Sequence, residues 1–203
     1  MTLLALMLAA ATVGALHSLA PDHWVPFAAL ARARQWSGMR TARLTLLCGF
    51  GHVTVSAILG IIGLFIGLET VRAFGSTLES HAALLLIGFG LAYTMWGLRR
   101  RHHHHGHPDG AHMTEWSLFI LFCADPCVAV IPMIMAASGS GWSAVLAVVL
   151  VYEIATMATM VVLVSTAHAG VRTLKFAWID HYGDAVAGAL IVCLGAVLTV
   201  LGI

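Results

Sequence analysis

The sequence predicts an all-α integral membrane protein whose six transmembrane helices form two inverted repeats of three. Three observations lead to this fold class. Hydrophobic residues make up 60% of the chain and charged residues 9%, whereas an ordinary soluble domain has about 45–50% and about 25%. The apolar runs are continuous rather than alternating, which favours helices over a β-barrel. Stretches of the first half also recur in the same order in the second half.

Each predicted span is an apolar segment comparable to the roughly 20 residues that cross a bilayer. The segments comprise residues 3–31, 44–68, 82–98, 116–137, 142–168 and 185–203. No basic region precedes the first segment, so we expect a membrane span there rather than a signal peptide. We expect a single transmembrane domain made of a first repeat (1–98), a histidine-rich loop (99–115) and a second repeat (116–203).

The basic residues predict how the chain is oriented. All but Arg72 of the 10 lysines and arginines fall in the first, third and fifth loops. The positive-inside rule assigns such loops to the cytoplasm. We therefore expect both termini outside, the histidine-rich loop in the cytoplasm, and a location in the bacterial inner membrane.

Three pairs of segments carry the repeat. Residues 90–98 and 195–203 share Gly, Thr and Gly at matching positions. Residues 50–55 align near 151–156, which brings His52 opposite Glu153, and each of 21–26 and 125–132 is a polar cluster with two prolines. Because each repeat has an odd number of spans, the two repeats are expected to have opposite orientations.

Prolines are expected to break the first and fourth spans. A proline has no N–H to donate to the carbonyl four residues before it. Pro21 would therefore free the carbonyl of His17, and Pro126 that of Phe122. Irregular backbone at this depth is tolerated where it lines a cavity or packs against protein, and it is typical of transporter sites. The predicted breaks are at Pro21, Pro26, Pro126 and Pro132.

Ionisable and thiol side chains lie near the middle of four spans. A charged group at this depth costs about 2.5–3.5 kcal/mol on insertion scales, so such groups usually face a cavity, pair with one another or bind something. Imidazole suits Ni, Co, Zn and Cu, and carboxylates add charge neutralisation. We predict one shared site for a divalent metal ion, formed by His17, Asp22, His23, His52, Asp125, Cys127 and Glu153.

Ordinary structural roles stay open for single members of this set. His52 alone suits an interhelical hydrogen bond, and Cys127 suits close packing. Asp125 precedes a proline and suits a helix cap. His17, Asp22 and His23 point in different directions on an unbroken helix, and a break at Pro21 lets them converge.

The loop between the repeats contains half of the chain's 12 histidines. Histidine-rich tracts are typical of metal binding. We expect the loop to collect metal ions in the cytoplasm, and a solvated basic loop that only sets topology is the alternative. Its histidines are His102, His103, His104, His105, His107 and His112.

The stretch HSLAPDH at 17–23 resembles the motif of the nickel/cobalt transporter family, in which His, four residues and Asp-His follow one another. The six-span layout with a histidine-rich central loop is similar to the shorter nickel/cobalt efflux branch. The sequence from Pro126 to Pro132 also resembles the urease-accessory-type and sulfite-exporter-type transmembrane proteins of the lysine-exporter superfamily. The resemblance implies that His17, Asp22 and His23 are metal ligands or selectivity residues. The importers of the family have eight spans, and their motif usually carries a further acidic residue, where this chain has Leu19 or Pro21.

These observations favour a secondary transporter of Ni²⁺ or Co²⁺, with Zn²⁺ as an alternative cargo. Efflux is favoured over import because the loop would collect ions on the cytoplasmic side. The chain has no GxxxxGK[ST] motif for a nucleotide, so proton exchange through Glu153, Asp125 or the histidines is the expected coupling. The partners expected are the metal ion, protons and the lipid bilayer, with no nucleic acid, and the oligomeric state stays open.

Two other classes of function remain. An intramembrane zinc-dependent hydrolase would use a zinc-bound water, with Glu153 as its base. A membrane thiol-electron carrier would use Cys127, but it needs a second, facing cysteine. The matching place in the first repeat has Asp22 or His23 instead. We therefore expect a transporter rather than an enzyme.

Overall fold

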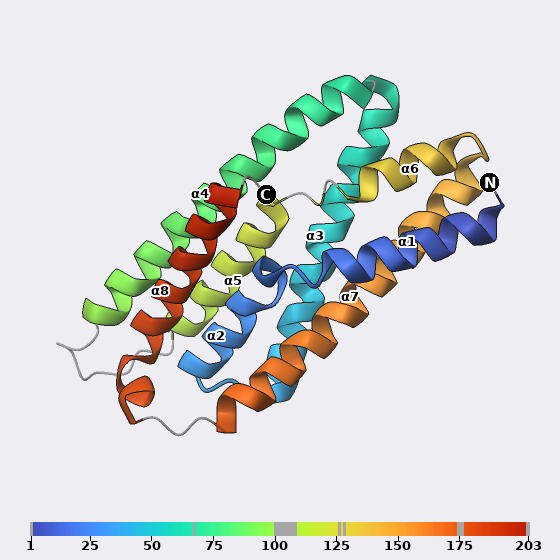
Figure 1. The fold of residues 1–203 in the computed structure, drawn as a ribbon. Helices are drawn as coiled ribbons and strands as arrows, with labels where there is room; N and C mark the ends of the chain where they lie inside the picture. Colours follow the sequence, from blue (N-terminus) through green and yellow to red (C-terminus); the bar gives the residue numbers. More distant parts are fainter. Residues whose placement is uncertain are drawn as a thin grey trace.

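The computed structural model describes residues 2–66, 68–99, 109–125, 127, 129–173 and 177–201, and these residues contain helices and no strand. The all-α prediction is confirmed. Figure 1 shows the elements, which in chain order are α1 (Leu3–His17), the 3₁₀ turn η1 (Pro21–His23), α2 (Val25–Ala33), α3 (Gly38–Ile66), α4 (Leu68–Arg99), α5 (Asp109–Ala124), α6 (Val130–Ser138), α7 (Trp142–Thr173) and α8 (Ala177–Leu201).

Several helices are long and apolar enough to cross a membrane. Within the described ranges there are three such helices, at Gly38–Ile66, Trp142–Gly170 and Tyr182–Val200. The pair Leu3–His17 and Pro21–Ala33 passes the same criterion together and is bent by 77°. Ala83–Arg99 and Thr114–Ala124 form shorter apolar helices. This arrangement is compatible with a membrane protein of three or four full spans and additional apolar helices.

The first predicted span is interrupted at Pro21. Helix α1 ends at His17, and Pro21 opens η1 before the chain turns into α2. The carbonyl of His17 accepts a hydrogen bond from the N–H of Ala20 at 3.1 Å. Pro26 is the second residue of α2, where a helix needs no N–H from it. Pro26 therefore belongs to the first turn of a helix and does not break one.

The fourth predicted segment is also divided. Helix α5 ends at Ala124 and α6 begins at Val130. Pro132 is the third residue of α6 and, like Pro26, lies in a first turn rather than at a break. Pro126, the other predicted break, lies outside the described residues.

The helices pair across the two halves of the chain. Helix α8 lies beside the C-terminal part of α4, and α1 lies along α7 (Figure 1). Helix α2 packs against α7 and α8, whereas α5 and α6 pack against α3. The long helices α3 and α7 also contact each other, so the two halves are interleaved.

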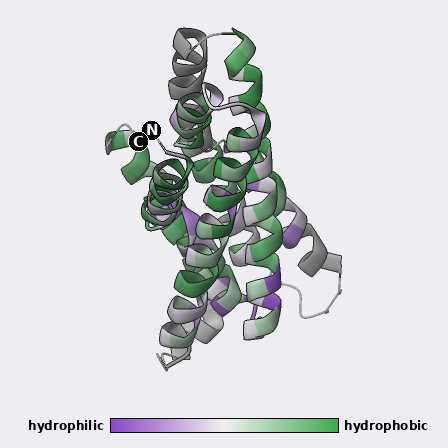
Figure 2. Cartoon of the chain, turned by 90° about the vertical axis from the view of Figure 1, so that its right-hand side faces the viewer, coloured by the Kyte–Doolittle hydropathy of each residue, from purple (hydrophilic) through white to green (hydrophobic). Residues whose placement is uncertain are grey.

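The helical bundle contains two apolar cores. The first contains side chains from α2, α3, α4, α5, α7 and α8, among them Phe27, Cys48, Phe122, Met160 and Ile191. The second contains side chains from α1, α3, α6 and α7 together with the connection before α6, among them Ala10, Val53, Cys127, Ile134 and Tyr152. Many large apolar side chains are exposed, as expected of a surface that contacts lipid. Figure 2 shows that apolar residues run along most of the helices.

Candidate metal centre

Three histidines from separate elements meet where the two cores adjoin. His17 is the last residue of α1, His23 the last of η1, and His52 lies within α3. The ring centroids of His17 and His23 are 4.3 Å apart, those of His23 and His52 are 5.2 Å apart, and those of His17 and His52 are 6.2 Å apart. One nitrogen from each ring lies within 4.8 Å of the other two. The structure thus brings together three of the seven predicted ligands.

The end of α1 is held in place by α7. A methyl group built on Gly14 would lie 2.9 Å from the backbone oxygen of Tyr152, so the absent side chain lets the two backbones approach closely. The hydroxyl of Ser18 donates to the carbonyl of Gly14 at 2.8 Å and also lies 3.2 Å from the carbonyl of Thr156. These contacts fix the position of His17.

His23 and His52 are buried and His17 is partly buried, and the Nε2 atoms of all three are buried without a hydrogen-bond partner among the described residues. His23 is 3% exposed and His52 is 1% exposed. Most buried polar atoms in native proteins are hydrogen-bonded, so several unpartnered ones at one place call for an explanation. A bound cation would satisfy all three nitrogens together.

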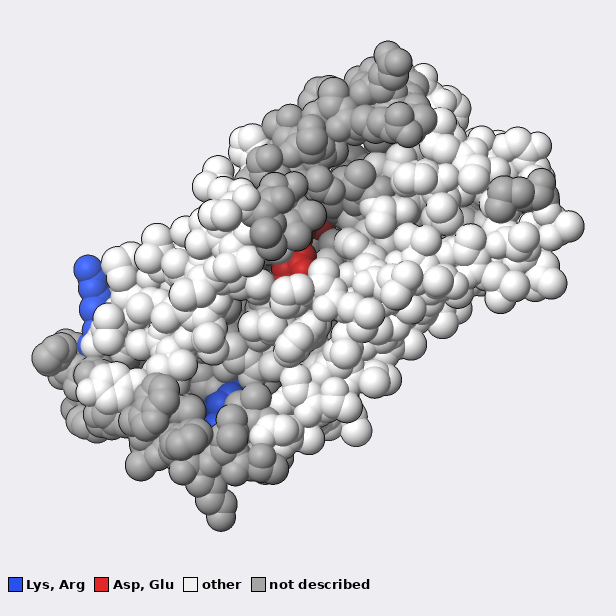
Figure 3. Space-filling model, viewed as in Figure 1, with Lys and Arg blue, Asp and Glu red and all other residues white. Residues whose placement is uncertain are grey.

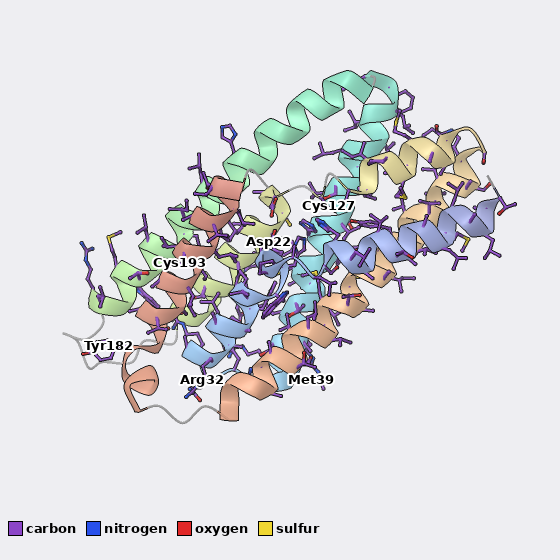
Figure 4. The ribbon with its side chains drawn as sticks, viewed as in Figure 1. Asp22, Arg32, Met39, Cys127, Tyr182 and Cys193 are labelled. Atoms are coloured by element: carbon purple, nitrogen blue, oxygen red, sulfur yellow. The ribbon has the colours of Figure 1, made fainter. Side chains whose placement is uncertain are left out.

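Asp22 is not one of the three grouped histidines, but its carboxylate contacts one of them. Its Oδ1 lies 3.1 Å from Nδ1 of His23, on the side of the ring away from Nε2. Figure 3 shows acidic atoms in the middle of one face, where Figure 4 labels Asp22 in the same view. A carboxylate on the second nitrogen of a ligating histidine orients the ring and raises its basicity. The position of Asp22 therefore suits a supporting group.

The segment after α5 provides the remaining neighbours. The carbonyl oxygen of Phe122 lies 3.1 Å from Nδ1 of His52. Asp125 interacts electrostatically with His23, and its backbone interacts with His52. The predicted member Asp125 thus lies near His23 and His52.

The other two predicted ligands point elsewhere. The thiol of Cys127 lies 2.8 Å from the hydroxyl oxygen of Tyr152, in a buried contact within the second core (Figure 4). The hydroxyl of Thr54 lies 3.4 Å from Oε1 of Glu153. Neither Cys127 nor Glu153 belongs to the group of three histidines.

The histidine-rich loop cannot be placed relative to this centre. His102, His103, His104, His105 and His107 lie outside the described residues. For His112 the structure gives the backbone, which belongs to α5. Metal binding by the loop stays a prediction.

Two buried hydroxyl residues at the site were missed by sequence reasoning. Ser18 follows His17 directly, and Ser56 is four residues after His52, on the same face of α3. Both are at most 1% exposed. Their spacing from the histidines was the available signal. Serine is common in apolar helices, where it usually bonds to its own backbone.

The arrangement can bind a cation through three nitrogens, with a carboxylate on one of the rings. It is the one group of three or more His, Cys, Asp or Glu side chains suited to this among the described residues. Comparison of the chain with models of protein families, with curated proteins and with solved structures finds no match.

Proposed function

We propose that this protein binds a divalent transition-metal ion between His17, His23 and His52 and moves it across a membrane as a secondary transporter. The observation that carries the proposal is the convergence of three histidine rings, each with one nitrogen within 4.8 Å of the others and with a buried Nε2 that has no hydrogen-bond partner among the described residues. The resemblance of residues 17–23 to the nickel/cobalt transporter motif points to the same cargo.

The donor atoms favour first-row ions of intermediate softness. Imidazole suits Ni²⁺, Co²⁺ and Zn²⁺, whereas Mg²⁺ and Ca²⁺ prefer oxygen. Metal–imidazole bonds of about 2.0–2.1 Å put tetrahedral nitrogens about 3.4 Å apart. The three nitrogens lie within 4.8 Å of one another, so a modest inward movement of the rings would complete the shell. Ni²⁺ or Co²⁺ is the proposed cargo, with Zn²⁺ as the alternative.

The surroundings of the site favour transport. His17 and His23 flank a 77° bend between two half-length apolar helices. Transporter sites typically lie where such broken helices meet near the middle of the membrane. The apolar cores on both sides of the histidines would keep the ion from crossing until the helices move.

Helix packing supports the inverted three-plus-three repeat. In the aligned stretches 90–98 and 195–203, Gly195 is the counterpart of Gly90, and the same alignment pairs Gly188 with Ala83. A methyl group built on Gly90 would lie 2.8 Å from the oxygen of Gly188, and one built on Gly195 would lie 2.9 Å from the oxygen of Ala83. Reciprocal contacts of this kind are expected of two halves related by a two-fold axis.

The proposal also covers the orientation of the chain in the membrane, the direction of metal transport and the ion that is exchanged for the metal. With the arginine-rich loops in the cytoplasm of a bacterial cell, the loop histidines would collect ions for export. Import by the same site is the alternative direction. Protons are the proposed counter-ion, with Glu153 and Asp125 as the carboxylates available to carry them.

An intramembrane zinc-dependent hydrolase is the second candidate. Three histidine ligands leave a fourth position for water, as in catalytic zinc sites. Such an enzyme also needs a base beside the metal. Glu153 contacts Thr54 and is not in the histidine group, so the observation favours transport.

Calorimetric titration with Ni²⁺, Co²⁺ and Zn²⁺ tests the site in purified protein. The titration should use a background in which residues 102–105 and 107 are serine, so that the loop does not contribute. We expect the background protein to bind one metal ion tightly. His52→Ala and His17→Ala should lose this binding, and the control His81→Ala, at an exposed residue, should keep it. Equal binding by His52→Ala and by the unaltered background would contradict the site.

Proteoliposomes with an enclosed metal-sensitive dye test transport. Flux should require His52 and respond to an imposed proton gradient. Tight binding without flux, together with hydrolysis of a membrane peptide, would favour the hydrolase.

A further inference from the structure

The carbonyl of Phe122 is available to His52 because of where α5 ends. The last four carbonyls of a helix have no partner within the helix, and Phe122 lies two residues before Ala124, the end of α5. In a helix continued past Ala124 the N–H of residue 126 would bond to this carbonyl, but residue 126 is proline and has no N–H. Nδ1 of His52 lies 3.1 Å from this oxygen.

This contact fixes the proton of His52. A carbonyl oxygen only accepts hydrogen bonds, so Nδ1 must carry the hydrogen. In a neutral imidazole the other nitrogen, Nε2, then has a lone pair. Nε2 of His52 is buried without a hydrogen-bond partner, so its lone pair is free for a metal.

Ser56 forms a second contact between α3 and the chain after α5, at Cys127. Its hydroxyl donates to the carbonyl of His52 at 2.6 Å and accepts the N–H of Cys127 at 2.6 Å. His52 and Ser56 are one turn apart on α3, so this helix contacts both Phe122, near the end of α5, and Cys127. Between these two residues lies Asp125, which interacts electrostatically with His23.

We propose that the carbonyl of Phe122 near the end of α5, with Ser56 bonded to the backbone of Cys127, positions His52 in the tautomer that presents Nε2 to the metal. In this way an interruption in the second half of the chain prepares a ligand from the first half. The inference rests on the proposed metal site, but it makes a claim about the metal-free protein as well.

Pro126→Ala tests this inference directly. Alanine brings an N–H that competes with His52 for the oxygen of Phe122. The matched control is Pro132→Ala, because Pro132 lies in the first turn of α6, where no N–H is required. ¹⁵N NMR of histidine-labelled protein without metal reports the tautomer, with the His52 signals assigned from their loss in His52→Gln.

We expect His52 of the unaltered protein and of Pro132→Ala to carry its hydrogen on Nδ1, and Pro126→Ala to show both tautomers. We also expect Pro126→Ala to bind Ni²⁺ about tenfold or more weakly, the loss typical of removing a partner of a ligating histidine. Hydrogen on Nε2 in the unaltered protein, or an unchanged tautomer and affinity in Pro126→Ala, would overturn the inference.

Ser56→Ala provides a second test that leaves the proline in place. Its control is Ser138→Ala, an exposed serine whose hydroxyl bonds to its own helix at Met135. Ser56→Ala should weaken Ni²⁺ binding and mix the tautomers, whereas Ser138→Ala should do neither, and equal behaviour of the two would count against the inference. If the unaltered protein binds no metal but His52 holds its hydrogen on Nδ1, the proposed function fails while the positioning claim stands.

Discussion

The guanidinium carbon of Arg34 lies 4.2 Å from the centre of the Trp96 ring. Its Nε donates to the hydroxyl of Tyr93 at 2.6 Å and lies 3.3 Å from Oδ1 of Asp184. The hydroxyl of Tyr93 donates in turn to the same carboxylate at 2.7 Å. One side chain at the end of α2 thus connects α4 and α8. Because α2 begins two residues after His23, these contacts also restrict the position of the segment that carries His23.

Arg34→Lys should destabilise the protein by about 1–3 kcal/mol. Lysine keeps the charge but loses the planar group that stacks on Trp96 and bonds to Tyr93. The control is Arg40→Lys. Arg40 forms an ion pair with Glu115 in which both side chains are partly exposed, and such pairs contribute less than about 1 kcal/mol. Thermal unfolding in detergent compares the two variants, and equal shifts would show that the Arg34 contacts add nothing special.

Gly188→Ala should destabilise the α4–α8 pair by about 2 kcal/mol or more, in the range of overpacked interiors. A methyl group there would lie 2.6 Å from the backbone nitrogen of Thr94 and 2.7 Å from the oxygen of Gly90. Because these are backbone atoms, the two helices must move apart.

The matched control for this substitution is Gly139→Ala, since a methyl group on Gly139 meets nothing within 4 Å. Resistance to proteolysis and the unfolding temperature in detergent measure the difference. A Gly188→Ala protein as stable as the Gly139→Ala protein would refute the close packing of these helices.

Asp22→Asn and Cys127→Ala should separate a supporting group from a packing residue. Asp22 lies 3.1 Å from Nδ1 of His23, so loss of its charge should weaken Ni²⁺ binding about tenfold. The thiol of Cys127 contacts Tyr152 instead, so Cys127→Ala should leave the Ni²⁺ affinity unchanged. Calorimetry on both variants checks this, and weaker binding by Cys127→Ala would make the thiol a ligand after all.

The sequence by itself determined the class of fold and the first part of the site. In lipid a chain satisfies its backbone with helices or a closed barrel, and apolar runs that are continuous rather than alternating favour helices. The structure is helical in every described element. Pro21 marked the interruption beside His17 because proline cannot donate the missing hydrogen bond. The predicted breaks at Pro26 and Pro132 were wrong because proline is also favoured in the first turn of a helix. Spacing alone does not distinguish a proline that breaks a helix from one that begins it.

Only the tertiary structure decided which polar residues meet. Depth along a span can be counted from sequence, but the direction of a side chain depends on helix rotation and packing. His52 turns toward His17 and His23, whereas Cys127 turns toward Tyr152 and Glu153 toward Thr54. The backbone oxygen of Phe122 became a partner of His52 only when α5 packed against α3. Contacts between distant segments follow from the fit of helix surfaces, which a single sequence does not state.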